Sequence, residues 1–296
     1  MFLILPVSVE YKANRMPLVT FWLMGINTAI HLALMILFFT NQAANERVYE
    51  LFALVPNDST WHTYLTYNFL HADIIHLLGN MIYLFLFGSC VEDIIGRGKF
   101  IAFYLLAGVL AGFGHVFVAH PSTIMMVGAS GAISGCMGAF VLLLHNRQIE
   151  FKYLFLFFFR LFTGDFFLPA WLVISFWFGL DVLGVLLSSG TEGGGVAYGA
   201  HVGGFLAGMA AAPGLRKWVN AESRRKLVEA RAREAESTWT ATIPPDAQIT
   251  VLDFEQQHGP YSLAELWGAH QEGQFSEDAL YWHEGMEDWA PLNEAL

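Results

Sequence analysis

The chain has 296 residues, of which 55% are hydrophobic and 14% are charged. Soluble domains carry charge on about a quarter of their residues, so this composition excludes an ordinary soluble protein and indicates a membrane protein. The net charge of −11 is concentrated at one end, because residues 239–296 hold eleven Asp and Glu and no Lys or Arg, whereas residues 1–238 hold fifteen of each sign. The acidic tail is therefore predicted to be a separate domain.

Residues 1–16 lack the leading positive region of a signal peptide, and we expect them to form a short cytoplasmic stub. Six apolar segments are then long enough to cross a bilayer: 17–39, 74–91, 100–119, 129–146, 168–187 and 196–213. A further apolar run from Phe151 has about a dozen residues and includes Lys152 and Arg160, so it is predicted to lie at the membrane interface. The predicted fold class is an all-α polytopic membrane protein, with a six-helix bundle over residues 17–215.

The distribution of basic residues predicts the orientation. With six crossings, fourteen of the fifteen Lys and Arg residues lie on one side of the membrane and only Arg47 lies on the other. Because Lys and Arg are enriched in cytoplasmic loops, both termini are predicted to be cytoplasmic. We expect an integral protein of a bacterial inner membrane, in which the second, fourth and sixth helices begin near the outer face.

The chain after the bundle divides into two parts. Residues 216–247 are predicted to form a basic helix and then a linker containing Pro244 and Pro245, which exclude helix. Residues 248–296 combine an alternating strand, a turn at Gly259 and Pro260, and a helical segment, so they are predicted to form a small soluble α+β domain.

Four polar residues in the predicted spans fall at one depth. His76 and Asn80 lie in the first turns of the second helix, Ser130 opens the fourth, and His201 lies about five residues into the sixth. At 1.5 Å rise per residue, all four lie within roughly 10 Å of the same membrane surface. Buried ionisable groups in a membrane are costly and are therefore candidates for function.

These residue types suit acyl transfer by a serine nucleophile. His201 would take the proton of Ser130 and return it to the leaving amine. An oxyanion would meet the free backbone N–H of Ser130 at a helix start, and the side chains of His76 and Asn80 would add two more donors. Small residues repeat at spacing four in "GASGAISG" and "GAHVGGFLAG", which allows the two helices to approach closely.

Other interpretations remain open. Gly128, Gly131, Gly135 and Gly138 alone are more typical of membrane helix packing than of catalysis. A catalytically silent scaffold that binds transmembrane segments would need the same packing. A channel or transporter fits less well, because the polar groups cluster at one depth instead of tracing a path across the bilayer. Neither Cys90 nor Cys136 suggests a metal site, and no cofactor is expected.

Four blocks in this order, "FLHADIIHLLGNMIYLFLFG", "VEDIIGRGKFIAFYLLAG", "GASGAISG" and "AHVGGFLAG", resemble the rhomboid intramembrane serine proteases over about residues 15–215. The resemblance implies a Ser130–His201 dyad without a third carboxylate, oxyanion-hole side chains at His76 and Asn80, and a structural role for His71. It also implies a serine endopeptidase that cleaves membrane proteins in or near a transmembrane helix, which is easier where Gly or Pro weakens that helix. Asp181 is not required by such a mechanism and is left as structural or unassigned.

Two positions depart from the family pattern. The first loop has Trp61-His62 where Trp-Arg is frequent, and Ser134 stands where an aromatic ring often packs against the catalytic imidazole. Tyr198 or Phe205 is a candidate to orient His201 in place of that ring. The segment 188–198 contains four glycines and is predicted to be a mobile lid above His201.

The tail blocks "HGPYSLAELW" and "LYWHEGMEDWAPL" resemble the GYF-like domains over about residues 248–296. The resemblance implies binding of proline-rich peptides. An aromatic groove for such peptides would use Tyr261, Trp282 and Trp289, although the same aromatics would also serve as the core of a fifty-residue domain. No nucleic-acid partner is expected.

Overall fold

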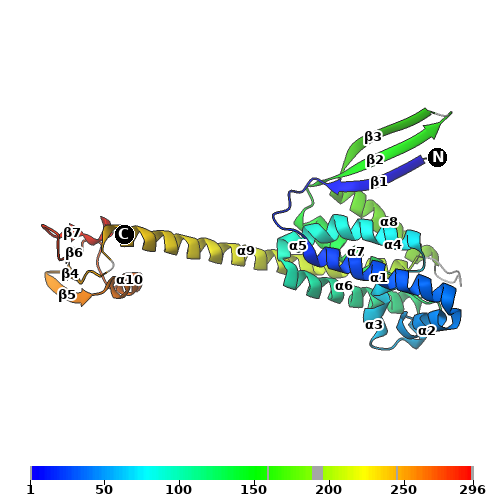
Figure 1. Ribbon diagram of the computed structural model, residues 1–296, viewed down its shortest axis with the longest axis horizontal. Helices are drawn as coiled ribbons and strands as arrows, with labels where there is room; N and C mark the ends of the chain where they lie inside the picture. The colour runs from blue at the N-terminus through cyan, green and yellow to red at the C-terminus, as the bar shows by residue number, and fades with distance from the viewer. Residues whose placement is uncertain (1, 159, 189–195, 245, 295–296) are drawn as a thin grey trace. The chain divides into compact units, whose positions relative to one another are not determined.

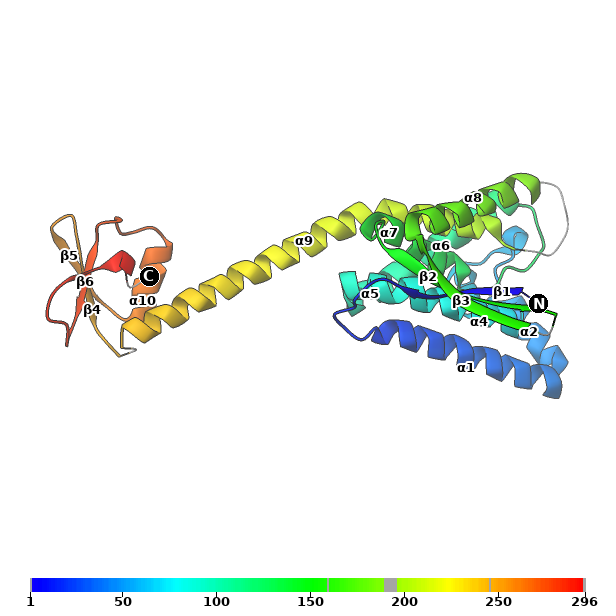
Figure 2. The ribbon, with the colours of Figure 1, turned by 90° about the horizontal axis from the view of Figure 1, so that it is seen from above.

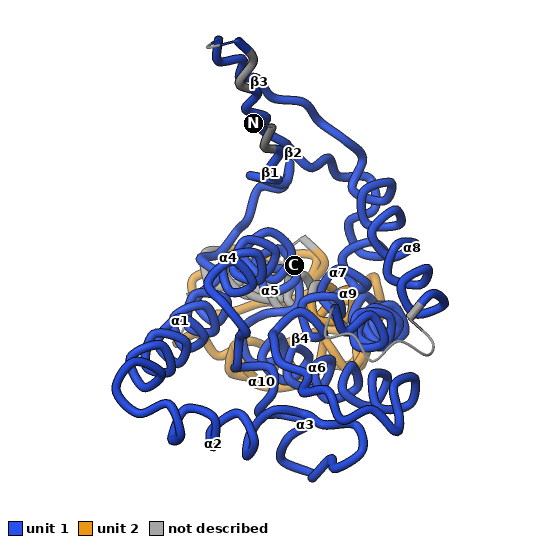
Figure 3. The backbone as a smooth tube through the Cα atoms, turned by 90° about the vertical axis from the view of Figure 1, so that its right-hand side faces the viewer, with its two compact units in different colours: residues 1–219 blue, residues 220–296 orange. Residues whose placement is uncertain are grey.

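The computed structural model describes residues 2–158, 160–188, 196–244 and 246–294. The chain divides into two compact units, residues 1–219 and residues 220–296 (Figure 3).

Helices dominate the first unit (Figure 1). Their bounds are α1 Leu18–Thr40, α2 Gln42–Phe52, α3 Thr63–Thr66, α4 Ile74–Tyr83, α5 Ser89–Ile95, α6 Arg97–Ala119, α7 Ser130–Leu143, α8 Ala170–Ser188 and the first part of α9 Tyr198–Thr242. A π-helical turn, Leu84–Gly88, joins α4 to α5, so the chain is helical without a break from Ile74 to Ile95. Short 3-10 turns lie at Pro56–Asp58 and Tyr67–Phe69 in the loop between α1 and α4.

Among the described residues, four helices are long and apolar enough to cross a membrane: Leu18–Thr40, Ile74–Ile95, Arg97–Ala119 and Ala170–Leu187. These four helices match four of the six predicted spans, and their length and apolar composition are those of membrane-spanning helices in an integral membrane protein. The segment predicted as the fourth span forms the shorter apolar helix Ser130–Leu143. The sixth segment opens the 45-residue α9, which continues through Pro213. The count of six crossings therefore stays a prediction.

Helix α7 lies at the centre of the first unit, surrounded by the neighbouring helices (Figure 3). Every residue from Gly131 to Phe140 is buried. The main core cluster joins Ala132 and Phe140 of α7 to Phe87 and Tyr104 of the surrounding helices. Both cysteines are free and buried in this cluster. The glycine-rich helix is thus almost completely enclosed, and its first turn lies inside the protein.

The prediction of an all-α bundle is wrong in one respect, because the first unit also contains a three-stranded antiparallel sheet of order β1-β2-β3. Its strands are β1 Phe2–Val9, β2 Gln148–Phe157 and β3 Arg160–Pro169. The apolar run from Phe151 is thus a strand hairpin, and the N-terminal stub supplies an edge strand that pairs Phe2 with Phe155. This pairing joins segments more than 140 residues apart, and no pattern local to either segment reveals it.

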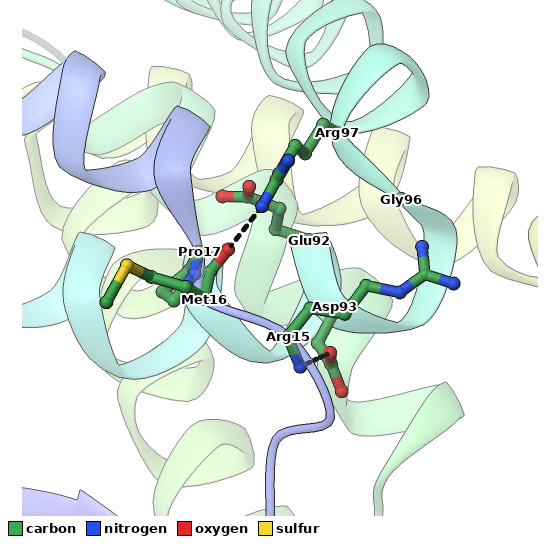
Figure 4. Close-up of a pocket in the computed structure, with 7 residues that line it drawn as sticks. All are labelled: Arg15, Met16, Pro17, Glu92, Asp93, Gly96 and Arg97. Atoms are coloured by element: carbon green, nitrogen blue, oxygen red, sulfur yellow. Dashed lines mark hydrogen bonds between the residues drawn. The ribbon is translucent and has the colours of Figure 1, made fainter.

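Two acidic residues at the end of α5 hold the start of α1 (Figure 4). The buried carboxylate of Glu92 accepts hydrogen bonds from the backbone N–H groups of Val19 and Thr20 and from the Thr20 hydroxyl, at 2.7–3.0 Å. Asp93 accepts from the backbone of Asn14 and Arg15. The bonds to Glu92 satisfy two first-turn donors of α1, whose N-cap is a proline that supplies no side-chain acceptor, and those to Asp93 hold the segment that leads into the helix. The pocket at this junction is lined by residues that hold the start of α1 in place, among them Arg15, Glu92 and Asp93.

The second unit contains the end of α9, the strands β4 Ile249–Asp253, β5 Gln256–Tyr261, β6 Leu280–His283 and β7 Ala290–Pro291, and α10 Leu263–Gln271. The sheet order is β5-β4-β6-β7. Helix α9 ends at Thr242, before Pro244. A capping box between Ser262 and Glu265 begins α10. Ile249, Val251 and Leu266 form the centre of a small core, which agrees with the predicted α+β domain.

Candidate active site

Ser130 and His201 are hydrogen-bonded to each other. Ser130 is the first residue of α7, and His201 lies one turn into α9. The Nε2 atom of His201 lies 2.9 Å from the Ser130 hydroxyl oxygen. Because Ser130 opens its helix, its backbone N–H belongs to the first turn, whose donors have no intrahelical acceptor. A hydroxyl, an imidazole and a free helix N-terminus therefore meet at one point.

Glycines allow α7 and α9 to approach this closely. A Cβ atom added to Gly204 would overlap the carbonyl oxygen of Gly131, and one added to Gly208 would overlap the carbonyl oxygen of Gly135. Backbone thus packs directly on backbone at two successive turns, which is the arrangement that small residues at spacing four permit. The contact between Gly204 and Gly131 lies one turn from His201 and one residue from Ser130, so it sets the separation of the two side chains.

His76 and Asn80 lie beside the segment that leads into Ser130. Gly128 has φ +124°, and a Cβ atom added there would lie 2.7 Å from Cε1 and 2.8 Å from Nε2 of His76. The same position is 3.8 Å from Nδ2 of Asn80, which also donates to the carbonyl of His76 at 3.0 Å. Only glycine fits this backbone conformation and this space. The structure thus brings both predicted oxyanion-hole side chains against the chain two residues before Ser130.

His71 is fully buried next to His76, and their ring centroids are 5.3 Å apart. Its ring also meets that of His31 edge to face at 6.5 Å. Its carbonyl accepts the Tyr49 hydroxyl at 2.9 Å, which ties the first loop to the start of α4. Neither ring nitrogen of His71 has a hydrogen-bonding partner among the described residues. Burial lowers the pKa of His71 to about 4, so this imidazole is neutral near pH 7.

The sequence alone left Asp181 as structural or unassigned. Its Oδ1 atom lies 2.9 Å from Nδ1 of His201, on the opposite side of the ring from Ser130. The side chains of His201 and Asp181 are 17% and 19% exposed. Asp181 is the single charged residue of α8 in the sequence, and an ionisable residue in an apolar helix was the signal that could have singled it out.

The other residues considered as supports for His201 pack against α8. The rings of Phe205 and Phe178 stack with centroids 4.3 Å apart, and a Cβ atom added to Gly184 would lie 2.6 Å from the ring of Tyr198. Ser134 is buried in α7 and supplies no ring. The predicted lid over residues 188–198 falls mainly on 189–195, which lie outside the described residues.

The three aromatic residues predicted for peptide binding lie in the second unit and are all partly buried. The ring of Tyr261 packs edge to face on Phe275, with centroids 6.0 Å apart. The indole N–H of Trp282 donates to the carbonyl of Met286 at 3.1 Å. Tyr261 also packs against the core of the unit, so at least part of this aromatic surface has a structural role.

A partly buried serine–histidine pair at the start of a helix, among apolar helices long enough to cross a membrane, points to a family of membrane serine proteases. The model of the Rhomboid domain matches residues 58–218, and the chain belongs to the rhomboid family. The model of GYF domain 2 matches residues 251–295, in the second unit.

Three relatives are similar over part of the chain. The putative rhomboid protease YdcA of Bacillus subtilis is 36% identical over 91 residues, which are 30% of this chain and 45% of the relative. The rhomboid protease GluP of the same organism is 42% identical over 93 residues, 30% of this chain and 17% of the relative. The chloroplastic rhomboid-like protein 11 of Arabidopsis thaliana is 33% identical over 122 residues, 41% of each chain. The matched segments thus span less than half the length of each of these relatives.

Proposed function

We propose that the chain is an intramembrane serine endopeptidase that uses Ser130 and His201. The observation that carries the proposal is the 2.9 Å hydrogen bond between His201 Nε2 and the Ser130 hydroxyl at the start of α7. Membership of the rhomboid family and the protease names of YdcA and GluP support it. The substrate class we propose is a membrane protein that is cut in or near a transmembrane helix.

The proposed reaction has two steps. His201 takes the hydroxyl proton as Ser130 attacks the peptide carbonyl, and it returns that proton to the leaving amine, which gives an acyl-enzyme. Water then attacks the ester with His201 again as the base, and Ser130 is regenerated. In both steps the oxyanion would accept hydrogen bonds from the Ser130 backbone N–H and from the side chains of His76 and Asn80.

The same proposal includes the topology and the domain boundaries. It has six crossings over residues 17–215, with the shorter helix α7 and the first part of α9 as the fourth and sixth. Both termini are cytoplasmic, the membrane is a bacterial inner membrane, and the reactive serine lies near the outer face. The distribution of basic residues supports this orientation. A stub at 1–16, a linker at 216–247 and a soluble domain at 248–296 complete the division.

The test is cleavage of a model transmembrane substrate in liposomes by the full chain and by Ser130→Ala and His201→Ala. We expect both substitutions to abolish cleavage and Ser130→Ala to abolish labelling by a fluorophosphonate. Leu180→Ala, at an exposed position of α8, is the matched control and should cleave at the wild-type rate. A wild-type chain that cuts no substrate and takes no label would refute the proposal and favour a silent scaffold.

We also propose that residues 248–296 bind proline-rich peptides through Tyr261, Trp282 and Trp289. The match to GYF domain 2 and the partial exposure of all three side chains support this assignment. Tryptophan fluorescence of the full chain should change on titration with a proline-rich peptide, and Trp289→Ala should weaken binding at least tenfold. An equal response to a peptide in which every proline is replaced by alanine would contradict this assignment.

A further inference from the structure

We infer that Asp181 is a positioning residue for His201, so that the proposed peptidase works with a Ser130–His201–Asp181 triad. This inference rests on the function proposed above and goes beyond the dyad that the family resemblance implies. Four observations carry it: the hydrogen bonds of the imidazole, the register of the two helices, the residue at position 134 and the isolation of the carboxylate.

The imidazole of His201 is held from both sides. Nδ1 lies 2.9 Å from the Asp181 carboxylate, and Nε2 lies 2.9 Å from the Ser130 hydroxyl. A carboxylate only accepts hydrogen bonds, so Nδ1 must carry the proton of the neutral ring. Nε2 is then unprotonated and can accept the proton of Ser130, which is the tautomer that a general base needs.

Packing on either side of the pair fixes its register. The first part of α9 runs alongside α8 (Figure 2). Phe178 stacks on Phe205 one turn from the pair in one direction, and Gly184 receives the ring of Tyr198 one turn away in the other. These contacts join residues 178 with 205, 181 with 201, and 184 with 198, which is a single antiparallel register. The carboxylate therefore faces the imidazole because the helices are packed together on either side of it.

The residue one turn after Ser130 on α7 supplies no ring to hold the imidazole. Ser134 is buried and too small to stack on His201. Asp181 reaches the imidazole from α8 and constrains it by a hydrogen bond.

Asp181 is also costly to keep where it is. It is the one charged residue in the sequence of α8, a helix apolar enough to span a membrane. Such groups are retained in membrane helices where they have a partner and a function. The ionisable groups that interact with His201 include Asp181 on α8, His76 on α4 and His115 on α6. Asp181 is the anion among them, so it is the group suited to stabilise the imidazolium that forms during attack.

The experiment compares Asp181→Asn and Asp181→Glu in the full chain, reconstituted in liposomes with a model transmembrane substrate. The Asn side chain has nearly the same shape but can donate to Nδ1 and so favour the wrong tautomer. We expect Asp181→Asn to lower kcat by roughly 10²–10⁴-fold with KM within about threefold of wild type. Asp181→Glu keeps the carboxylate and should recover at least tenfold of the loss. Fluorophosphonate labelling of Ser130 should slow in parallel with kcat, and the thermal midpoint should stay near that of wild type.

Two results would overturn the inference. One is a kcat for Asp181→Asn within about threefold of wild type. The other is an equal loss in both variants together with a lowered thermal midpoint, which would indicate a structural contact only. Leu180→Ala, next to Asp181 on the exposed side of α8, is the control and should resemble wild type. Cleavage by wild type that Ser130→Ala abolishes would leave the proposed function intact in either case, so the two failures are distinguishable.

Discussion

The close approach of α7 and α9 gives a test in which one methyl group should displace the proposed base. In Gly204→Ala the new Cβ would overlap the carbonyl oxygen of Gly131, far inside the 3.0 Å that real Cβ atoms respect. Both elements are helix backbone in a dense core, so the helices must separate by about 1 Å at this turn. His201, three residues earlier, would carry its Nε2 from 2.9 Å to about 3.9 Å from the Ser130 hydroxyl, which is beyond hydrogen-bond reach.

The expected result is a fall in kcat of about 100-fold, with a loss of about 1–3 kcal/mol in the free energy of unfolding. The assay is cleavage of the model transmembrane substrate, alongside thermal unfolding in detergent. Gly214→Ala is the matched control on the same helix, because its added Cβ would meet nothing within 4 Å. It should keep full activity. If Gly204→Ala were as active and as stable as Gly214→Ala, the contact between the two backbones would not set the distance from Ser130 to His201.

Three further predictions concern other contacts. Gly128→Ala should lower kcat by roughly 10–100-fold, because φ +124° is strained for alanine and the methyl group would displace His76. The control is Gly79→Ala, whose added Cβ has open space around it, and its kcat should stay at the wild-type value. Acidification from pH 7 to pH 4 should lower the free energy of unfolding by up to about 3 kcal/mol, because His71 takes up its proton near pH 6.5 when unfolded but only near 4 when folded. The free energy of unfolding of His71→Phe, measured in thermal melts, should depend less on pH. The same pH dependence in this variant as in wild type would contradict the prediction. Glu92→Gln should lower the free energy of unfolding by about 1.5–3 kcal/mol, because it weakens the three hydrogen bonds at the start of α1. Glu50→Gln, in an exposed ion pair, should lower it by under about 1 kcal/mol. Equal losses in chemical unfolding would refute the role of Glu92.

The sequence by itself determined the features that depend on local pattern. Apolar length located α1, the continuous helix from Ile74 to Ile95, α6 and α8, because a span must present about 20 apolar residues whatever surrounds it. Small residues at spacing four indicated that α7 and α9 pack closely, and the depth of Ser130 and His201 indicated that they could meet. The hydrogen bond between them agrees with both inferences.

Only the tertiary structure decided what depends on partners distant in the chain. The sheet pairs Phe2 with Phe155, and an apolar run such as 151–162 reads alike for a membrane-facing helix and for a strand until its partner is known. Asp181 could be seen in the sequence as an isolated charge, but its partner lies twenty residues away on another helix. Two packing contacts between α8 and α9, one on either side of the pair, aim its carboxylate at Nδ1 of His201, and that alignment exists only once both helices are in place.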